Sequence, residues 1–386
     1  MILLIPLLAF ALCAMLHYIA LRLFPRMGLL DFPERYGLHR PRIPYPTGIL
    51  ALAVFVVFFL SIFPTINFPA FAKATAGKQF IINVQNIGIV LGILLLGLTS
   101  FMDDRTPLPP LLRLYIQMTV AVIIFATGSR IYTITNPLES FTGIPYLKLD
   151  TMDIPSQFSI FNFQFSIFPT PLPLLSGLFT ILWLGLAMNA LNWFDGIPGQ
   201  VSSLSSLGFT VIGLLAISAR VNQPQVALLA FILAGIAGAC LLFDFPVPLP
   251  HVLMGDTGAM FFGLMLAVLT IYAGGKVATA FLAFGVPFSD CLIVIARRIV
   301  AGRSPFSSGT QSEHLHHRLL ARGWSEQKII ILNIILGSAF GIGALFLNTT
   351  GKFLAILLLI CSLLVLSQGS RKGMNTQQKV HGHNMQ

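Results

Sequence analysis

The chain has 386 residues, of which 56% are hydrophobic and only 9% are charged, and its mean hydropathy is +0.85. A soluble domain carries about 25% charged residues, so this composition excludes a soluble globular protein and indicates an integral membrane protein. The net charge of +10 requires no nucleic-acid partner, because a basic membrane face also suits anionic lipid headgroups and anionic substrates.

The apolar runs predict an all-α integral membrane protein with about 10–11 transmembrane helices. We interpret the opening segment, Met1–Leu23, as a first span, because it lacks the basic region and the small-residue cleavage site of a signal peptide. Residues 1–368 then form a polytopic membrane domain, and residues 369–386 form a short polar cytoplasmic tail. The predicted spans lie near residues 1–22, 46–66, 86–101, 111–127, 173–191, 201–218, 225–243, 258–273, 278–297, 329–348 and 352–368.

The charges predict the orientation of these spans. With the amino terminus outside, 16 of the 23 Lys and Arg residues lie on the inner side, as the positive-inside rule requires. Nine of the 13 acidic residues lie on that side too, mostly at span ends. Solvated loop charge is one explanation, but in a chain so poor in carboxylates this placement favours a metal or phosphate site. We therefore predict an active site at the cytoplasmic face of the plasma (inner) membrane.

Two outer connections, near residues 67–85 and 128–172, are unusually long. The second repeats the string Gln-Phe-Ser-Ile-Phe at 157–161 and 164–168. We expect both connections to be tolerated insertions and assign no secondary structure to the repeats.

Asp103 and Asp104 stand side by side at the inner end of the third span. Adjacent carboxylates at a membrane surface repel each other unless a cation or a proton lies between them, and Mg²⁺ with phosphate oxygens is the usual solution. A pair of prolines then begins the next helix, which places Arg113 and Gln117 one turn apart on one face. An Asp-Asp pair alone is weak evidence for a metal site, and this continuation strengthens it.

A second group, Asn189, Asn192, Asp195 and Gly196, closes the fifth span. Steps of three residues keep the polar side chains on about a third of the helix circumference. Amides and a carboxylate at a span end are costly unless they face a cavity or partners. A capped helix end explains the glycine but not two asparagines, so we favour a functional role.

Met254-Gly255-Asp256-Thr257-Gly258 precedes the eighth span and should open a helix at the inner side. Free backbone amides and the helix dipole would make this end attractive to phosphate. Asp256 could equally cap the helix without any catalytic role.

The inner loop after the ninth span contains Gly302-Arg303-Ser304-Pro305-Phe306, followed by His314-Leu315-His316-His317-Arg318-Leu319-Leu320. Such a loop could bind a transition metal or be a solvated basic loop. Because the paired aspartates lie on the same side, we favour the interpretation that this loop holds a diphosphate and sugar hydroxyls. Asp290, inside the ninth span, is expected to orient this arm.

The four cysteines, Cys13, Cys240, Cys291 and Cys361, each lie alone in an apolar run. They have no metal-ligand spacing in the sequence and no obvious pairing, so buried packing is the favoured role.

In this order, the four inner motifs resemble those of the polyprenyl-phosphate N-acetylhexosaminyl-1-phosphate transferase family (glycosyltransferase family 4), and its WecA/TagO type more than its MraY type. The resemblance runs from about Leu30 to Lys328. The family pattern Asp-Asp-x3-Leu-x-Pro-x2-Lys-Leu-x2-Gln is met at every fixed position except the lysine, which is Arg113 here. Four motifs in register are far more specific than any one of them.

Two departures from the family pattern concern acidic residues. The usual Asp-Gly-x-Asp-Gly segment has Pro198 in place of its second acid, so the role of that acid cannot be transferred to this chain. The acid expected three residues before His314 is Gln311, although Glu313 is close.

The resemblance implies that a polyprenyl phosphate, such as undecaprenyl phosphate, attacks the β-phosphate of a UDP-sugar and that UMP leaves. The sugar is expected to be N-acetylglucosamine or a related N-acetylhexosamine. Catalysis of this kind is mostly positioning and charge neutralisation. The resemblance does not determine the oligomeric state and is compatible with a homodimer.

The same resemblance assigns roles to residues. Asp103 and Asp256 are the expected ligands of Mg²⁺, which Mn²⁺ could replace, and Asp104 is assigned either to the metal or to deprotonation of the lipid phosphate. With these three catalytic residues, the expected substrate-binding residues are Asn189, Asn192 and Asp195 on the nucleotide side and Arg113, Arg303, His314, His316 and His317 around the diphosphate and sugar.

Two other functions remain open from the sequence. An inactive paralogue that binds lipid phosphate or nucleotide would account for Pro198. A polytopic transporter would account for the many spans and the intramembrane Asp290, but transporters place polar groups near mid-membrane in repeated halves.

Overall fold

The computed structural model describes residues 3–36, 40–62, 84–149, 153–154, 157–160, 163–166, 172–219, 221–273, 276–304 and 313–368. The predicted tail, 369–386, lies outside these residues, and so does most of the predicted outer connection 67–85.

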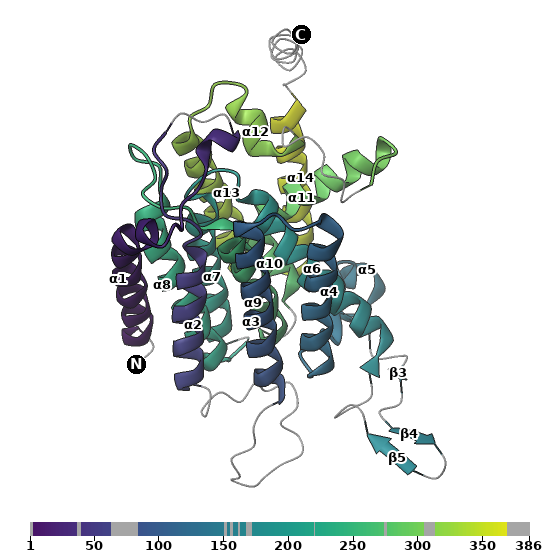
Figure 1. The fold of residues 1–386 in the computed structure, drawn as a ribbon. Helices are drawn as coiled ribbons and strands as arrows, with labels where there is room; N and C mark the ends of the chain where they lie inside the picture. Colours follow the sequence, from purple (N-terminus) through teal and green to yellow (C-terminus); the bar gives the residue numbers. More distant parts are fainter. Residues whose placement is uncertain are drawn as a thin grey trace.

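The described chain is a bundle of helices that run up and down beside one another (Figure 1). The helices are α1 (Leu4–Arg26), η1 (Pro33–Tyr36), α2 (Gly48–Ile62), α3 (Val84–Arg105), α4 (Pro110–Ala126), α5 (Glu139–Thr142), α6 (Leu174–Phe194), α7 (Gln200–Ile217), α8 (Pro224–Asp244), α9 (Gly255–Tyr272), α10 (Val277–Ala283), α11 (Gly285–Val300), α12 (Leu315–Leu320), α13 (Glu326–Phe346) and α14 (Thr349–Gln368).

Within the described residues, 8 helices are long and apolar enough to cross a membrane, and the bent pair α10 and α11 would make a ninth. The apolar helices α2 and α4 are shorter. Every predicted span coincides with one of these elements. The predicted all-α integral membrane fold is therefore confirmed.

The predicted span at 278–297 is broken in the structure, because α10 and α11 meet at an angle of 95°. Phe284 lies between the two helices, and Pro287 follows in the first turn of α11. A proline lacks the backbone N–H that would bond to the preceding turn, so it suits the start of a new helix better than the continuation of an old one.

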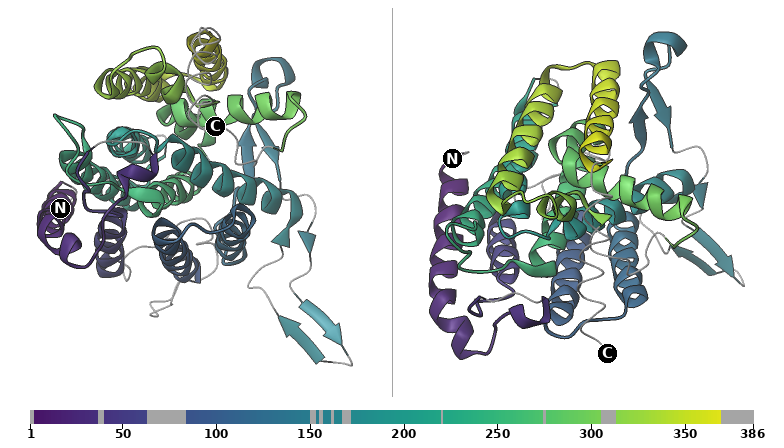
Figure 2. Two further views of the ribbon diagram at one scale, coloured as in Figure 1. Left: turned by 45° about the horizontal axis from the view of Figure 1, so that its top comes forward. Right: turned by 90° about the horizontal axis from the view of Figure 1, so that it is seen from above.

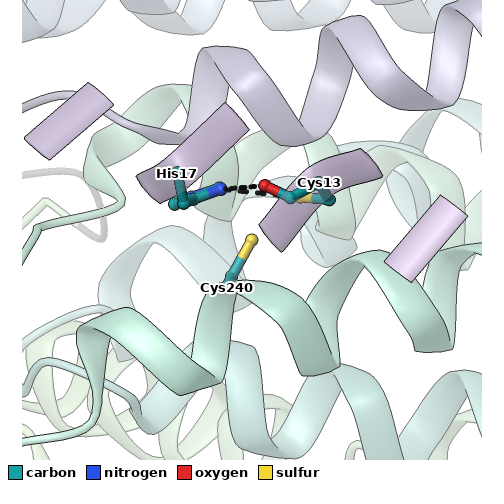
Figure 3. Close-up of side chains that lie close together, drawn as sticks. All are labelled: Cys13, His17 and Cys240. Atoms are coloured by element: carbon teal, nitrogen blue, oxygen red, sulfur yellow. Dashed lines mark hydrogen bonds between the residues drawn. The ribbon is translucent and has the colours of Figure 1, made fainter. Parts of the chain in front are cut away.

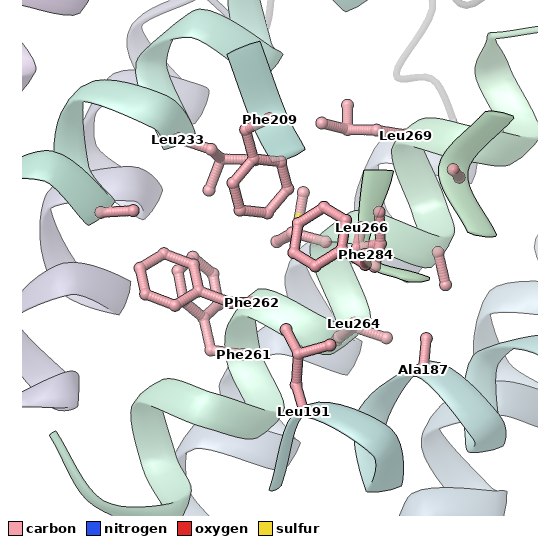
Figure 4. Close-up of a cluster of buried hydrophobic side chains, with 14 of the residues drawn as sticks. Ala187, Leu191, Phe209, Leu233, Phe261, Phe262, Leu264, Leu266, Leu269 and Phe284 are labelled. Atoms are coloured by element: carbon pink, nitrogen blue, oxygen red, sulfur yellow. The ribbon is translucent and has the colours of Figure 1, made fainter. Parts of the chain in front are cut away.

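Helix α9 is the centre of the bundle, and α2, α3 and α6 pack around it. Every residue of α9 is buried except Asp256. The packing is close: a methyl group on Gly263 would lie 2.8 Å from the Cα atom of Met188. Aromatic side chains fill the core beside it, with Phe209 5.9 Å from Phe262 and 5.7 Å from Phe284 between ring centroids (Figure 4).

The helix ends that carry the predicted motifs meet at one end of the bundle. Helices α3 and α6 end there, and α4 and α9 begin there (Figures 1 and 2). The loops that follow α1 and α8 are joined beside them by backbone hydrogen bonds, from Leu253 N to Pro44 O (3.0 Å) and from Thr47 N to Leu253 O (2.9 Å). These two loops therefore form one side of the candidate site.

The opposite end of the bundle carries short antiparallel strand pairs. They are β1 (Thr133–Thr135) with β2 (Tyr146–Lys148), β3 (Asp153–Ile154) with β6 (Leu172–Pro173), and β4 (Gln157–Ile160) with β5 (Phe163–Ser166). In the last pair the repeated sequence pairs with itself, with Phe158 opposite Phe165, and the hairpin projects away from the helices (Figure 2). The repeats alternate polar and apolar residues, which is the pattern of a strand.

Candidate active site

Two of the predicted carboxylates share one cation. The Arg113 Nη1 atom, in the first turn of α4, lies 3.0 Å from Asp103 Oδ2 and 3.5 Å from Asp256 Oδ2. The other oxygen of Asp103 accepts a hydrogen bond from the backbone N–H of Leu108 at 2.6 Å. This bond fixes the turn between α3 and α4, so the turn itself brings Arg113 back over Asp103.

Asp104 is engaged by the start of α9. Its Oδ1 atom accepts hydrogen bonds from the backbone N–H of Asp256 (2.8 Å) and the hydroxyl of Tyr45 (2.6 Å). Its Oδ2 atom accepts hydrogen bonds from both the backbone N–H (3.0 Å) and the hydroxyl of Thr257. Asp104 therefore caps α9 from another helix.

This arrangement corrects one expectation. The backbone amides of Asp256 and Thr257 are not free for phosphate, because Asp104 occupies them. The Asp256 carboxylate itself contacts Arg113 and Asn192.

The asparagines of α6 extend the cluster. Asn192 donates from Nδ2 to Asp256 Oδ2 at 3.4 Å, and its Oδ1 atom is buried without a hydrogen-bond partner. Asn189 donates to Gln117 Oε1 at 2.7 Å, so it is joined to α4 rather than to the carboxylates. The structure thus brings Asn192 to the acidic cluster and gives Asn189 a contact beside it.

The cluster carries an excess of negative charge. Burial, together with the negative charges of Asp256, Asp244 and Asp104, raises the pKa of Asp195 well above its ordinary value. Arg113 is the cation that contacts the carboxylates of Asp103 and Asp256 in the described residues. A further cation would relieve this repulsion.

The available atoms fit Mg²⁺. Its preferred ligands are oxygens, supplied by one or two carboxylates with waters and substrate phosphates making up the rest. Asp103 and Asp256 offer carboxylate oxygens in one place, and the unpartnered Asn192 Oδ1 is a third oxygen beside them.

The histidine arm is anchored as the sequence suggested. Asp290 in α11 bonds through Oδ2 to His314 Nδ1 at 2.7 Å, and its Oδ1 accepts a hydrogen bond from the backbone N–H of Leu315 at 2.8 Å. The carboxylate therefore holds the start of α12. The His314 ring then lies 5.8 Å from the Trp193 ring of α6, measured between centroids.

His316 is the arm residue that meets the acidic end of α6. Its ring is buried against Gly196, where an added methyl group would collide with the imidazole. Burial and the neighbouring His317 and His314 lower its pKa well below the ordinary value, so the ring is held neutral. Both ring nitrogens are without partners in the described structure, and the His317 ring lies 4.2 Å away. Burial also lowers the pKa of His317.

Arg303, which is expected to bind the diphosphate and sugar, pairs with an acidic residue of its own arm. Glu313 accepts hydrogen bonds from Arg303 Nη2 (2.6 Å) and Arg298 Nε (2.7 Å). Burial alone would raise the pKa of Glu313, but these bonds lower it overall. Arg303 is thereby held against Glu313 rather than against the carboxylates around Arg113. Gln311 lies outside the described residues.

Pro198 lies in the turn between α6 and α7. The next residue, Gly199, has a positive φ of 83°, a conformation that suits glycine, and α7 begins directly after it. The proline therefore occupies a tight turn beside Asp195.

Tyr45 is a site residue that the sequence analysis missed. Its hydroxyl bonds to Asp104 although the two residues lie 59 positions apart. The only local signal is its place between Pro44 and Pro46 in the connection after α1.

Comparison with known proteins agrees with this arrangement. The family model described as "Glycosyl transferase family 4" matches residues 86–274, which include the Asp103, Asn192 and Asp256 motifs. The chain is 27% identical over 344 residues to the "Probable undecaprenyl-phosphate N-acetylglucosaminyl 1-phosphate transferase" of Bacillus subtilis, covering 88% of this chain and 82% of that protein.

Two other relatives show the same relationship. The "Decaprenyl-phosphate N-acetylglucosaminephosphotransferase" of Mycobacterium tuberculosis is 27% identical over 80% of this chain and 72% of its own length. The "Phospho-N-acetylmuramoyl-pentapeptide-transferase" of Levilactobacillus brevis is 30% identical, over 39% of this chain and 45% of its own length. The motifs, the family model and these relatives agree in relating this chain to glycosyl transferase family 4.

Proposed function

We propose that this chain transfers an N-acetylhexosamine 1-phosphate, most simply N-acetylglucosamine 1-phosphate, from a UDP-sugar to a polyprenyl phosphate and releases UMP. One observation carries the proposal. In a central helix that is otherwise completely buried, Asp256 alone is partly exposed, and it shares Arg113 with Asp103. The phosphotransferase names of the relatives that span most of the chain support the same reaction.

In this reaction an oxygen of the lipid phosphate attacks the β-phosphorus of the UDP-sugar. The bond from that phosphorus to the bridging oxygen breaks, and UMP takes the bonding electrons. A bound Mg²⁺, held by Asp103, Asp256 and the Asn192 amide oxygen, would neutralise charge on the diphosphate. Mn²⁺ has the same ligand preference.

The chain's own residues position the substrates and neutralise the charge on their phosphates. Arg113 lies between the two carboxylates and offers N–H donors to phosphate oxygens. The neutral ring of His316 can donate from one nitrogen and accept at the other, which suits sugar hydroxyls or the uridine ring. Asp104 keeps α9, and with it Asp256, in register with these groups.

A small cavity of about 10 Å³ lies between α3 and α4 beside the carboxylates. Asp103, Arg113 and Gln117 are among its polar lining residues, and Leu96 and Met260 are among its apolar ones. This volume holds about one water molecule, so the cavity has no room for a lipid chain. We place only the lipid phosphate, next to Arg113.

The proposal also includes the identity of the sugar and the orientation of the protein in the membrane. The relatives named for N-acetylglucosamine match over 80–88% of this chain, and the muramoyl-pentapeptide relative over 39%. This difference favours UDP-N-acetylglucosamine as donor. The excess of Lys and Arg at the end of the bundle that holds Asp103 and Asp256 supports a cytoplasmic site in the plasma membrane with the amino terminus outside.

The test is UMP release by the purified protein in detergent with undecaprenyl phosphate, UDP-N-acetylglucosamine and Mg²⁺. Release should require both the lipid and the metal, and Asp256→Asn and Asp103→Asn should each abolish it. Glu34→Gln is the matched control, because it removes an exposed carboxylate that pairs with Arg42 outside the cluster. Full activity of either aspartate variant would refute the metal assignment.

Absence of UMP release with every UDP-N-acetylhexosamine would refute the enzyme. Titration with UDP-sugar and with lipid phosphate would then test for an inactive binding paralogue, the outcome that Pro198 would explain. Appearance of the lipid diphosphate sugar together with UMP would instead establish that Pro198 is tolerated.

A further inference from the structure

Three metal-binding side chains meet between α1 and α8, outside the candidate active site. Cys13 and His17 lie one turn apart on α1, and the Cys240 thiol points toward them from α8 (Figure 3). One potential ligand atom from each residue lies within 4.8 Å of the other two. All three side chains are buried, with exposed fractions of 2% or less.

The spacing of these atoms is close to that of a bound metal. The distance from Cys13 Sγ to His17 Nδ1 is 3.6 Å. Tetrahedral Zn²⁺, with bonds of about 2.3 Å to sulfur and 2.0–2.1 Å to nitrogen, also separates these atoms by about 3.6 Å. Two thiolate ligands of one Zn²⁺ lie about 3.8 Å apart, so Cys240 needs to move by no more than about 1 Å.

The thiol contacts of this cluster are long, and the imidazole bonds within its own helix. Cys13 Sγ lies 3.8 Å from Ile236 O, and His17 Nδ1 lies 2.9 Å from the Cys13 carbonyl. A metal bound at Nδ1 would replace this intrahelical hydrogen bond, and the ring proton would then lie on Nε2, which is buried without a hydrogen-bond partner.

Asp244 completes the surroundings of the cluster. It lies one turn after Cys240 on α8, is buried, and interacts electrostatically with both His17 and Cys240. Its Oδ1 atom accepts a hydrogen bond from Ser202 at 2.8 Å. Asp244 is not among the three grouped ligand residues, and it acts on them through its charge.

We propose that Cys13, His17 and Cys240 bind a divalent transition metal of the Zn²⁺ class, with Asp244 as an outer partner beside the set. Sulfur and imidazole ligands select such metals over Mg²⁺, which separates this site from the carboxylate cluster. Binding releases the two thiol protons, and the two thiolates balance the charge of the metal. A neutral complex is the form least costly to bury within the membrane.

The position of the site indicates a structural role. The metal would fasten α1 to α8 just before the two loops that lie beside Tyr45 and Asp256. Those loops are joined to each other by the backbone bonds between Leu253, Pro44 and Thr47. The metal would therefore hold one wall of the active site without touching substrate.

The test measures metal bound by the purified full-length protein after incubation with Zn²⁺ and removal of free metal. We expect about one Zn²⁺ per chain in the wild type and a value near zero in Cys240→Ala. Cys291→Ala is the matched control, because Cys291 is a buried cysteine of α11 that is not among these three residues, and this variant should keep the metal.

Replacement of Zn²⁺ by Co²⁺ in the wild type tests the ligands without a mutation that could prevent folding. Thiolate coordination gives an intense near-ultraviolet charge-transfer absorption that Co²⁺ bound to carboxylates lacks. This band should appear with about one Co²⁺ per chain and disappear on addition of Zn²⁺. Absence of the band, retention of Zn²⁺ by Cys240→Ala, or a disulfide between Cys13 and Cys240 would each overturn the proposal.

Discussion

Replacing Asp104 by asparagine tests whether this residue is a structural cap. The carboxylate accepts four hydrogen bonds, two on each oxygen, from Tyr45, Asp256 and Thr257. Asparagine keeps one acceptor oxygen. Its NH₂ group replaces the second oxygen and faces the two donors that were bonded to it. A hydrogen bond to a charged group contributes about 1.5–3 kcal/mol, so losing two costs about 3–6 kcal/mol. Hydroxyl donors can rotate away, which places the expected loss near the lower value.

The assay is equilibrium unfolding in mixed micelles of a mild detergent and SDS, followed by tryptophan fluorescence. Asp104→Asn should lose about 3 kcal/mol of unfolding free energy, and Tyr45→Phe, which removes one of the four bonds, about 1.5 kcal/mol. Asp256→Asn is the matched comparison in the same cluster, because the contacts of its carboxylate to Asn192 and Arg113 are longer, at 3.4 Å and 3.5 Å.

One result would refute this reasoning. If Asp104→Asn unfolds within about 0.5 kcal/mol of the wild type, the four bonds do not hold α9 in place, since that is the range of ordinary surface substitutions. Full stability combined with lost UMP release would instead assign Asp104 a chemical role, as the metal ligand or base that the sequence suggested.

Three further predictions concern the same cluster. Asp256→Asn should keep or raise the unfolding free energy, because it removes one of several neighbouring carboxylates, while UMP release falls more than about 100-fold; a stability loss equal to that of Asp104→Asn would contradict this. Gly196→Ala should lower turnover about 10–100-fold, because the ring carbons of His316, 2.7 and 2.8 Å from the added methyl, must withdraw; Gly343→Ala, whose methyl meets nothing within 4 Å, should leave turnover unchanged. The lowered pKa of His316 means that the unfolded chain takes up a proton below its ordinary value of 6.5 while the folded chain does not. Stability should therefore be fully present above about pH 6.5 and fall as the pH drops toward the lowered pKa, and unfolding of His316→Gln at a series of pH values should show a smaller fall.

The parts of the site that sequence predicts are those set by helix periodicity. Asn192 and Asp195 are three residues apart, so they share one helix face. Asp103 lies at the end of one predicted span and Asp256 at the start of another, both on the inner side of the membrane. The anchoring of His314 by Asp290 was also expected, because an acid inside a span needs a partner and the arm supplies one.

Other contacts depend on packing between distant segments, which local pattern does not encode. The bonds from Asp104 to the start of α9 join residues 152 and 153 positions apart. Cys13 and Cys240 each looked isolated in an apolar run, and the approach of Cys240 to Cys13 and His17 follows only from the packing of α1 against α8. The bend at Phe284 has a local signal in Pro287, but both arms are apolar and together have the length of one span, so the hydropathy pattern predicts a single helix.

The central position of α9 has a consequence for how the protein is made. This helix has the lowest mean hydropathy of the eight long spans, 1.4, whereas the peripheral α14 has 2.2. Lipid alone therefore retains α9 weakly, and its close glycine contacts stabilise it only when its neighbours are present. Most of those neighbours, α2, α3, α6, α7 and α8, precede it in the chain. We expect α9 to enter a partly assembled bundle late during synthesis, so that the aspartate cluster forms only after those helices have been inserted.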